Sequence, residues 1–194
     1  RPGRNPGDTD YLLTDGRVRP SSLVYGPKGE LLARYDKIHL FDVKVADQQA
    51  DYSESKSYEP GEELKTVSTE VGQLGLSVCY DLRFPELYRS LFLQGAEIVT
   101  VPAAFTRITG EAHWESLLRA RAIENQCYVI AAGQGGRHNE KRETWGHSMI
   151  IDPWGSILDQ VETGEGIAIA EIDLDTLKSV RTRMPIRQQI RLLD

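Results

Sequence analysis

The sequence predicts an α/β fold in which buried strands alternate with helices along the chain. Three observations predict it: apolar alternation over residues 73–79, an amphipathic helical pattern over residues 111–126, and two hairpin signals that bring antiparallel pairing. The chain has 194 residues, of which 40% are hydrophobic and 27% charged, as in ordinary globular proteins. We therefore expect one domain over residues 1–194.

The first ordered element is expected to be a hairpin. Residues 1–14 are rich in Pro and Gly and have no periodic apolar face, which indicates an irregular entry. Residues 22–25 and 31–35 then flank the turn GPKG at residues 26–29. Proline at the second position and glycine at the fourth favour a tight turn, so the two flanking segments are predicted to pair.

Strands and helices alternate after this hairpin. We expect strands at residues 73–79, 97–101 and 127–132, and helices at residues 85–94 and 111–126. A second hairpin is predicted at residues 147–151 and 156–161, joined by the turn DPWG, and a further strand at residues 166–172. A short helix capped by Asp173 is expected at residues 173–181.

Cys79 is the strongest candidate for a chemical role. It lies in LSVCYDLRFPEL, residues 76–87, at the predicted junction of a strand and a helix whose first position suits Pro85. Unpaired N–H groups and the positive end of the helix dipole would favour thiolate over thiol there. The pattern alone leaves two interpretations open, a nucleophile and a buried, inert cysteine.

Other polar residues give weaker signals. Lys37 follows a predicted strand in an apolar context, where a cation can stabilise an oxyanion, although a solvated charge is the simpler interpretation. Glu54 has no independent signal, and His113 is expected to be structural rather than catalytic. The charged run RHNEKRE, residues 137–143, is typical of a solvated loop and could also line the mouth of a site for an anionic substrate.

Composition limits the possible partners. The net charge of −6 argues against a nucleic-acid surface, and no apolar run approaches the roughly 20 residues of a membrane span. The two cysteines, Cys79 and Cys127, form no disulfide framework or zinc-site spacing, which indicates a reduced, cytoplasmic protein. A small-molecule partner is expected.

Four motifs, taken in order, resemble the nitrilase superfamily of carbon–nitrogen hydrolases. They are YDKIHLFDV, LSVCYDLRFPEL, HWESLLRARAIENQCYV and GHSMIIDPWG. The resemblance covers residues 22–184 and is to the Nit branch. The run QGGRHNEKRETWGHSM, residues 134–149, is more similar to the deaminated glutathione amidases than to the ω-amidases. An ω-amidase, another amidase of the superfamily or an acyltransferase are the alternatives.

The resemblance implies a four-layer αββα sandwich, a Glu-Lys-Cys triad, no metal or organic cofactor, and a homodimer. Cys79 matches the nucleophile, Lys37 the lysine and Glu54 the additional glutamate near the reacting carbon. The expected substrate-binding residues are Tyr80, Arg83, Phe105 and His113. The substrate is expected to be a small amide with a carboxylate, which Arg83, Arg107 or Arg137 could bind.

The resemblance places the remaining catalytic glutamate upstream of Lys37, on the first βα unit of the fold. The only glutamate before Lys37 is Glu30, whose place in a hairpin turn does not fit that motif. We therefore expect a domain that lacks its N-terminal βα unit and takes its general base from elsewhere. The alternative is a catalytically inactive fragment or scaffold.

Overall fold

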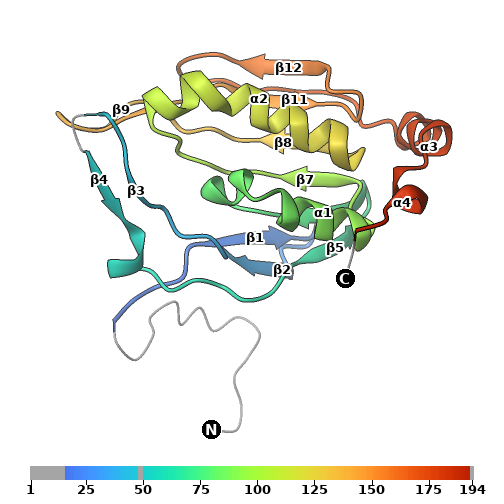
Figure 1. Cartoon of the computed structure of the whole chain (residues 1–194), viewed down its shortest axis with the longest axis horizontal. Helices are drawn as coiled ribbons and strands as arrows, with labels where there is room; N and C mark the ends of the chain where they lie inside the picture. The colour runs from blue at the N-terminus through green and yellow to red at the C-terminus, as the bar shows by residue number, and fades with distance from the viewer. Residues whose placement is uncertain (1–15, 48–49, 193–194) are drawn as a thin grey trace, which may run out of the picture.

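The computed structural model describes residues 16–47 and 50–192, and its centre is a six-stranded sheet (Figure 1). The strand order is β12-β11-β8-β7-β6-β5. The strands are β5 (Thr66–Thr69), β6 (Gly72–Leu76), β7 (Ile98–Thr100), β8 (Tyr128–Ala131), β11 (Ser148–Ile151) and β12 (Ile157–Val161). The strands β6, β7 and β8 pair in parallel, and the outer strands pair antiparallel. The predicted α/β class is confirmed.

Two helices, α1 (Pro85–Leu93) and α2 (Arg107–Asn125), cover one face of this sheet (Figure 1). Val99 and Val129 point to that face and belong to the main hydrophobic core. Their neighbours in the strands point to the other face, where Ile98 and Tyr128 pack with Leu177 of α3 (Leu174–Arg183). This alternation follows from the two-residue repeat of a strand.

The helix ends follow from their capping residues. Pro85 occupies the first turn of α1, where its missing N–H costs nothing. Thr106 caps α2 by accepting a hydrogen bond from the Thr109 N–H, so this helix begins earlier than residue 111. The predicted cap at Asp173 is confirmed, because its side chain accepts from the N–H groups of Asp175 and Thr176. A short helix, α4 (Ile186–Gln189), follows α3.

Both predicted hairpins are confirmed. The first consists of β1 (Ser21–Tyr25) and β2 (Leu31–Asp36), and the second of β11 and β12. Gly29 and Gly155 end the two turns with φ of 79° and 87°, a conformation that glycine adopts without strain. Lys37 comes directly after β2, so the first hairpin fixes where the lysine enters the molecule.

The edge strand β5 and the helix α4 were not predicted, and neither were four shorter strands and two 3₁₀ turns. The shorter strands and the turns are β3 (Asp42–Lys44), β4 (Asp51–Ser53), β9 (Gly135–Arg137), β10 (Glu143–Trp145), η1 (Glu54–Lys56) and η2 (Cys79–Arg83). The strands pair as β3-β4 and β9-β10, in two separate ribbons. Strands of three residues show too little alternation for a sequence pattern to detect.

Two predicted strands need correction. The predicted strand at residues 73–79 ends at Leu76 in the structure. Val78 is still extended, and the chain leaves the extended conformation at Cys79, whose φ is 52°. The strand at residues 166–172 is wrong: this segment has no strand partner among the described residues. Ile167 and Ile169, which suggested it, are 82% and 77% exposed.

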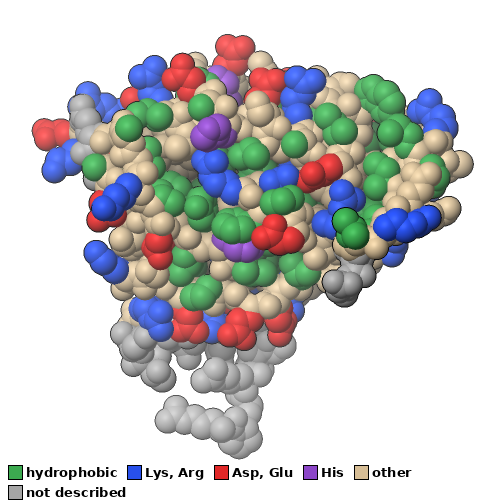
Figure 2. Space-filling view, viewed as in Figure 1, with side chains coloured by type: hydrophobic (Ala, Val, Ile, Leu, Met, Phe, Trp, Pro, Cys, Tyr) green, Lys and Arg blue, Asp and Glu red, His purple; other side chains and the backbone are tan. Residues whose placement is uncertain are grey.

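The visible face in Figure 2 mixes Lys and Arg with Asp and Glu, interspersed with apolar side chains. Within the described residues, no helix is both long enough and apolar enough to cross a membrane.

Candidate active site

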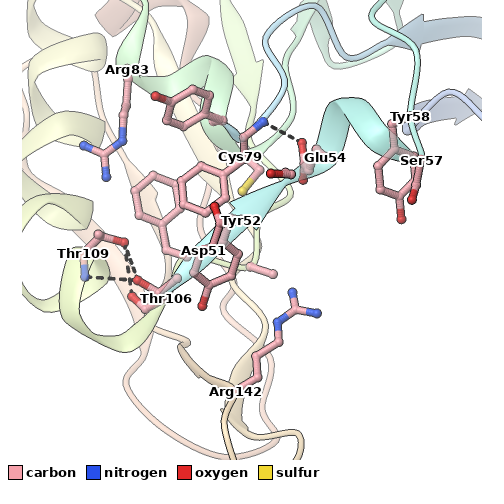
Figure 3. Close-up of a pocket in the computed structure, with 15 residues that line it drawn as sticks. Asp51, Tyr52, Glu54, Ser57, Tyr58, Cys79, Arg83, Thr106, Thr109 and Arg142 are labelled. Atoms are coloured by element: carbon pink, nitrogen blue, oxygen red, sulfur yellow. Dashed lines mark hydrogen bonds between the residues drawn. The ribbon is translucent and has the colours of Figure 1, made fainter. Parts of the chain in front are cut away.

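Cys79 opens the 3₁₀ turn η2 in a left-handed backbone conformation. Its N–H donates to the carbonyl of Pro102 at 2.9 Å, just beyond the end of β7. A residue other than glycine or asparagine in this conformation stores roughly 1–3 kcal/mol of strain, which the surrounding structure must offset. Such strain is concentrated at functional sites. In this conformation the Cys79 side chain points toward a cavity (Figure 3).

Lys37 and Glu54 form an ion pair beside this cysteine. The Lys37 side chain is only 2% exposed, and its Nζ donates to the Glu54 carboxylate. The same Glu54 oxygen accepts from the Phe41 N–H at 2.8 Å. A buried ammonium is costly without a partner, so the carboxylate holds the lysine both charged and in place.

Asp81 connects the cysteine turn to the lysine segment. It is fully buried, and its Oδ2 accepts from the Val78 N–H and the Tyr35 hydroxyl, each at 2.8 Å. Its Oδ1 accepts from the His39 N–H at 3.0 Å and lies 2.8 Å from His39 Nδ1. The His39 ring also stacks on Phe84 at 3.6 Å. These bonds fix the positions of Cys79 and Lys37 relative to each other.

The surroundings of Cys79 set the proton affinity of its thiol. Burial raises the pKa of Cys79, and this effect exceeds the opposing effects of the Lys37 charge and the hydrogen bond from the Ala104 N–H. The sequence predicted that the N-terminus of a helix would lower this pKa. The helix α1 begins only at Pro85, six residues after Cys79, and the effect of burial is the larger one. The thiol is protonated near neutral pH and needs a base to act as a nucleophile.

The thiol faces a cavity of about 280 Å³ with aromatic walls (Figure 3). Tyr80, Arg83 and Phe105 line it, as their predicted substrate-binding role requires. The Arg83 guanidinium carbon lies 5.2 Å from the Phe105 ring centre, and burial lowers the pKa of this arginine. His113 does not line the cavity but contacts Arg83, with 3.2 Å between Nδ1 and Nη1. Its predicted contact with the substrate stays a prediction.

Sequence reasoning missed much of the cavity wall. The lining residues it did not name are Phe41, Asp51, Tyr52, Ser53, Ser57, Tyr58, Ala104, Thr106, Thr109 and Arg142. The charged run at residues 137–143 was the one signal that could have found Arg142. Arg107 and Arg137 line a neighbouring hollow instead.

Among the described residues, the acidic side chains that line the cavity are Glu54 and Asp51. Glu30 lies exposed in the first hairpin, where its carboxylate accepts from the Lys28 N–H at 3.0 Å, and it does not line the cavity. Asp51 lines the cavity from β4. No group of three or more His, Cys, Asp or Glu side chains is arranged to hold a metal ion in the part of the chain that the structure describes.

Comparison with known proteins identifies the family. The family model described as carbon-nitrogen hydrolase matches residues 5–182, and the chain belongs to this family. The deaminated glutathione amidase of Yersinia enterocolitica is 53% identical over 176 residues, which cover 91% of this chain and 62% of that protein. The nitrilase-like assignment and the resemblance to the deaminated glutathione amidases are confirmed.

Solved structures of similar fold agree with this family assignment. The NitFhit protein of C. elegans superposes with a TM-score of 0.85 at 44% identity, covering 90% of this chain and 42% of that one. A Glu-to-Gln mutant of an amidase from Nesterenkonia is 28% identical, with a TM-score of 0.69 over 89% of this chain and 64% of that one. Its structure shows acrylamide added to the active-site cysteine of that protein. This chain spans 62% of the length of the Yersinia relative.

Proposed function

We propose that this chain carries the nucleophile and the oxyanion cation of an amidase. The observation that carries the proposal is the placement of Cys79 on a strained turn at the cavity, with the charge of the buried Lys37 acting on its thiol. A thiol beside a fixed ammonium is suited to acyl transfer, because the cation stabilises the negative oxygen that forms during attack.

The reaction proceeds through a thioester. A carboxylate takes the proton of the Cys79 thiol, and the sulfur attacks the amide carbon. The Lys37 ammonium and the N–H of Tyr80 stabilise the tetrahedral oxyanion. The C–N bond then breaks, and the carboxylic acid returns its proton to the leaving amine. Water loses a proton to the same carboxylate and attacks the thioester carbon. The C–S bond then breaks, the product acid leaves, and the protonated base returns its proton to the sulfur, which restores the thiol and the carboxylate.

The general base is proposed to come from outside the described residues. Glu54 is engaged with Lys37 and the Phe41 N–H, and Glu30 lies away from the cavity lining. The raised pKa of Cys79 makes such a base necessary near neutral pH. The proposed base is the glutamate that the family resemblance places on the first βα unit.

Deaminated glutathione is the proposed substrate, on the strength of the names of several relatives. Glutathione bears two carboxylates, and removal of its amino group leaves an anionic amide. Arg83, half-buried on the aromatic wall, supplies a cation for the carboxylate of the acyl part. The cavity therefore combines a nucleophile with a cation for a carboxylate-bearing amide.

We further propose a cytoplasmic homodimer. Both Cys79 and Cys127 are free thiols, which agrees with a reducing compartment. Light scattering coupled to size exclusion would give twice the chain mass for the dimer and the chain mass for a monomer.

The test compares two substrates on the full-length natural protein. Hydrolysis of deaminated glutathione should exceed that of a small ω-amide lacking the dipeptide part, and Cys79→Ala should abolish it. Cys127→Ala is the matched control, because this second thiol is buried away from the cavity lining. Faster turnover of the small amide would favour an ω-amidase. No turnover of either substrate would favour the scaffold alternative.

A further inference from the structure

Arg142 is an arginine without an anionic partner at the cavity mouth. It lines the Cys79 cavity and also the neighbouring hollow. Within the described part of the chain, its guanidinium forms no ion pair and no side-chain hydrogen bond. Tyr52 lines the same cavity, and burial and Asp47 raise its pKa to about 12 against the opposing charge of Arg142.

The backbone around Arg142 is fixed. Its N–H donates to Asn139 Oδ1 at 2.8 Å, and its carbonyl accepts from the His138 N–H at 2.9 Å. The next residue begins β10, where the Trp145 N–H donates to the carbonyl of Phe105, itself a lining residue, at 3.0 Å. Because these hydrogen bonds join the ribbon to the cavity wall, the backbone of Arg142 has a fixed position relative to the cavity.

The neighbouring arginines are engaged differently. Arg137 donates to the carbonyls of Asn139 and Glu140, and Arg107 lies 3.9 Å from the Glu143 carboxylate. Neither of them lines the Cys79 cavity. Of these three arginines, Arg142 is the one that lines the Cys79 cavity, and its guanidinium has no partner among the described residues.

Arg83 and Arg142 approach the cavity from opposite sides, with Cys79 between them in the view of Figure 3. Arg83 belongs to the same turn as the nucleophile, so it suits the acyl part that stays bound to sulfur. Arg142 is exposed at the rim, where the leaving part departs. Two described carboxylates line the cavity, those of Glu54 and Asp51, and Glu54 is already paired with Lys37. Asp51 alone cannot neutralise the charges of both Arg83 and Arg142.

We propose that Arg142 binds the carboxylate at the far end of the leaving amine, and thereby selects amides whose amine ends in a carboxylate. This rests on the proposed function, because it assumes that the amide carbon lies at Cys79. A planar guanidinium can bind a carboxylate through two parallel hydrogen bonds, which gives direction as well as attraction.

The experiment measures binding separately from hydrolysis. Calorimetry on the full-length natural protein with Cys79→Ala compares deaminated glutathione with its analogue in which the terminal carboxylate is a carboxamide. The carboxylate should bind about three- to tenfold more tightly, since the contact is charge-assisted but exposed to solvent. Adding Arg142→Gln should reduce this ratio to near one.

Lys141→Gln is the matched control, because it removes the same charge one residue away on a side chain that does not line the Cys79 cavity. It should keep the preference for carboxylate. An unchanged ratio in the Arg142→Gln variant, an equal loss in the Lys141→Gln variant, or no preference before either change would overturn the inference. Failed hydrolysis by the unmodified protein counts against the proposed function, while the binding ratio still decides the role of Arg142.

Discussion

Asp81 and His39 join the two segments that carry the reactive groups. Asp81 lies two residues after Cys79, and His39 lies two residues after Lys37. One carboxylate oxygen accepts from the His39 backbone N–H at 3.0 Å and lies 2.8 Å from its ring nitrogen. A single buried carboxylate therefore links the segment of the nucleophile to the segment of the lysine.

Asp81→Asn should destabilise the fold. An amide in the same place presents N–H groups to the donors of Val78 and Tyr35, so buried groups lose their partners. We expect the free energy of unfolding to fall by about 2–4 kcal/mol, measured by urea denaturation. Asp175→Asn on the exposed surface of α3 is the control and should change it by about 0.5 kcal/mol or less. Equal effects of the two changes would contradict the role assigned to Asp81.

Lys37→Met should raise the pKa of the Cys79 thiol further. Burial already raises that pKa and the Lys37 charge lowers it, so removing the charge leaves the larger effect unopposed. At any pH below this pKa, the variant therefore has a smaller thiolate fraction than the unchanged protein. Alkylation of Cys79 by iodoacetamide should be slower, and the midpoint of its pH dependence should move to higher pH. Cys127 should stay unlabelled in both proteins, because burial raises its pKa to about 12. An unchanged midpoint would show that the lysine charge does not reach the thiol.

Glu54→Gln should weaken both stability and catalysis. It leaves a buried Lys37 ammonium without its anion while keeping the acceptor for the Phe41 N–H. Because Glu54 is partly exposed, we expect a loss of about 1–2 kcal/mol in unfolding free energy rather than the full cost of a buried pair. The rate constant kcat should fall while KM changes little.

Glu63→Gln is the matched control for this change, because Glu63 forms an exposed ion pair with Lys65 at 2.6 Å. It should leave the urea midpoint and kcat nearly unchanged. A similar loss in both variants would mean that the burial of Lys37 has no energetic consequence.

The sequence predicted those parts of the fold that local chemistry determines. The turns GPKG and DPWG have their proline and glycine at positions that a tight turn prefers, and both hairpins formed. The caps at Pro85 and Asp173 likewise depend on single residues and were predicted correctly. Such features need no information from distant parts of the chain.

Other features depend on contacts that the linear pattern does not contain. The N–H of Cys79 donates to the Pro102 carbonyl, a bond that continues the pairing of the chain beyond Leu76, so the alternating pattern did not show where the strand ends. Arg142 reaches the cavity only because the β9-β10 ribbon folds against α2. The apolar alternation of Ile167 and Ile169 predicted a strand, but no pairing partner lies beside it among the described residues.

Gly110→Ala should displace the ribbon that carries Arg142. A Cβ at Gly110 would lie 2.2 Å from the Cβ of Trp145, a distance that forces the helix and the ribbon apart. We expect a loss of more than about 1 kcal/mol in unfolding free energy, although alanine favours a helix more than glycine does. Glu111→Ala, at an exposed neighbouring position of α2, is the control and should be nearly neutral. Stabilisation by Gly110→Ala would contradict the close packing.

The central claim is that Cys79 forms the thioester. The most direct test is to quench the full-length natural protein in acid during turnover of deaminated glutathione and to measure intact and peptide masses. The account predicts an acyl adduct on the peptide that contains Cys79, absent from Cys79→Ala, which should also lose at least about 10³-fold in rate. An adduct on another residue, or turnover that persists in Cys79→Ala, would contradict it.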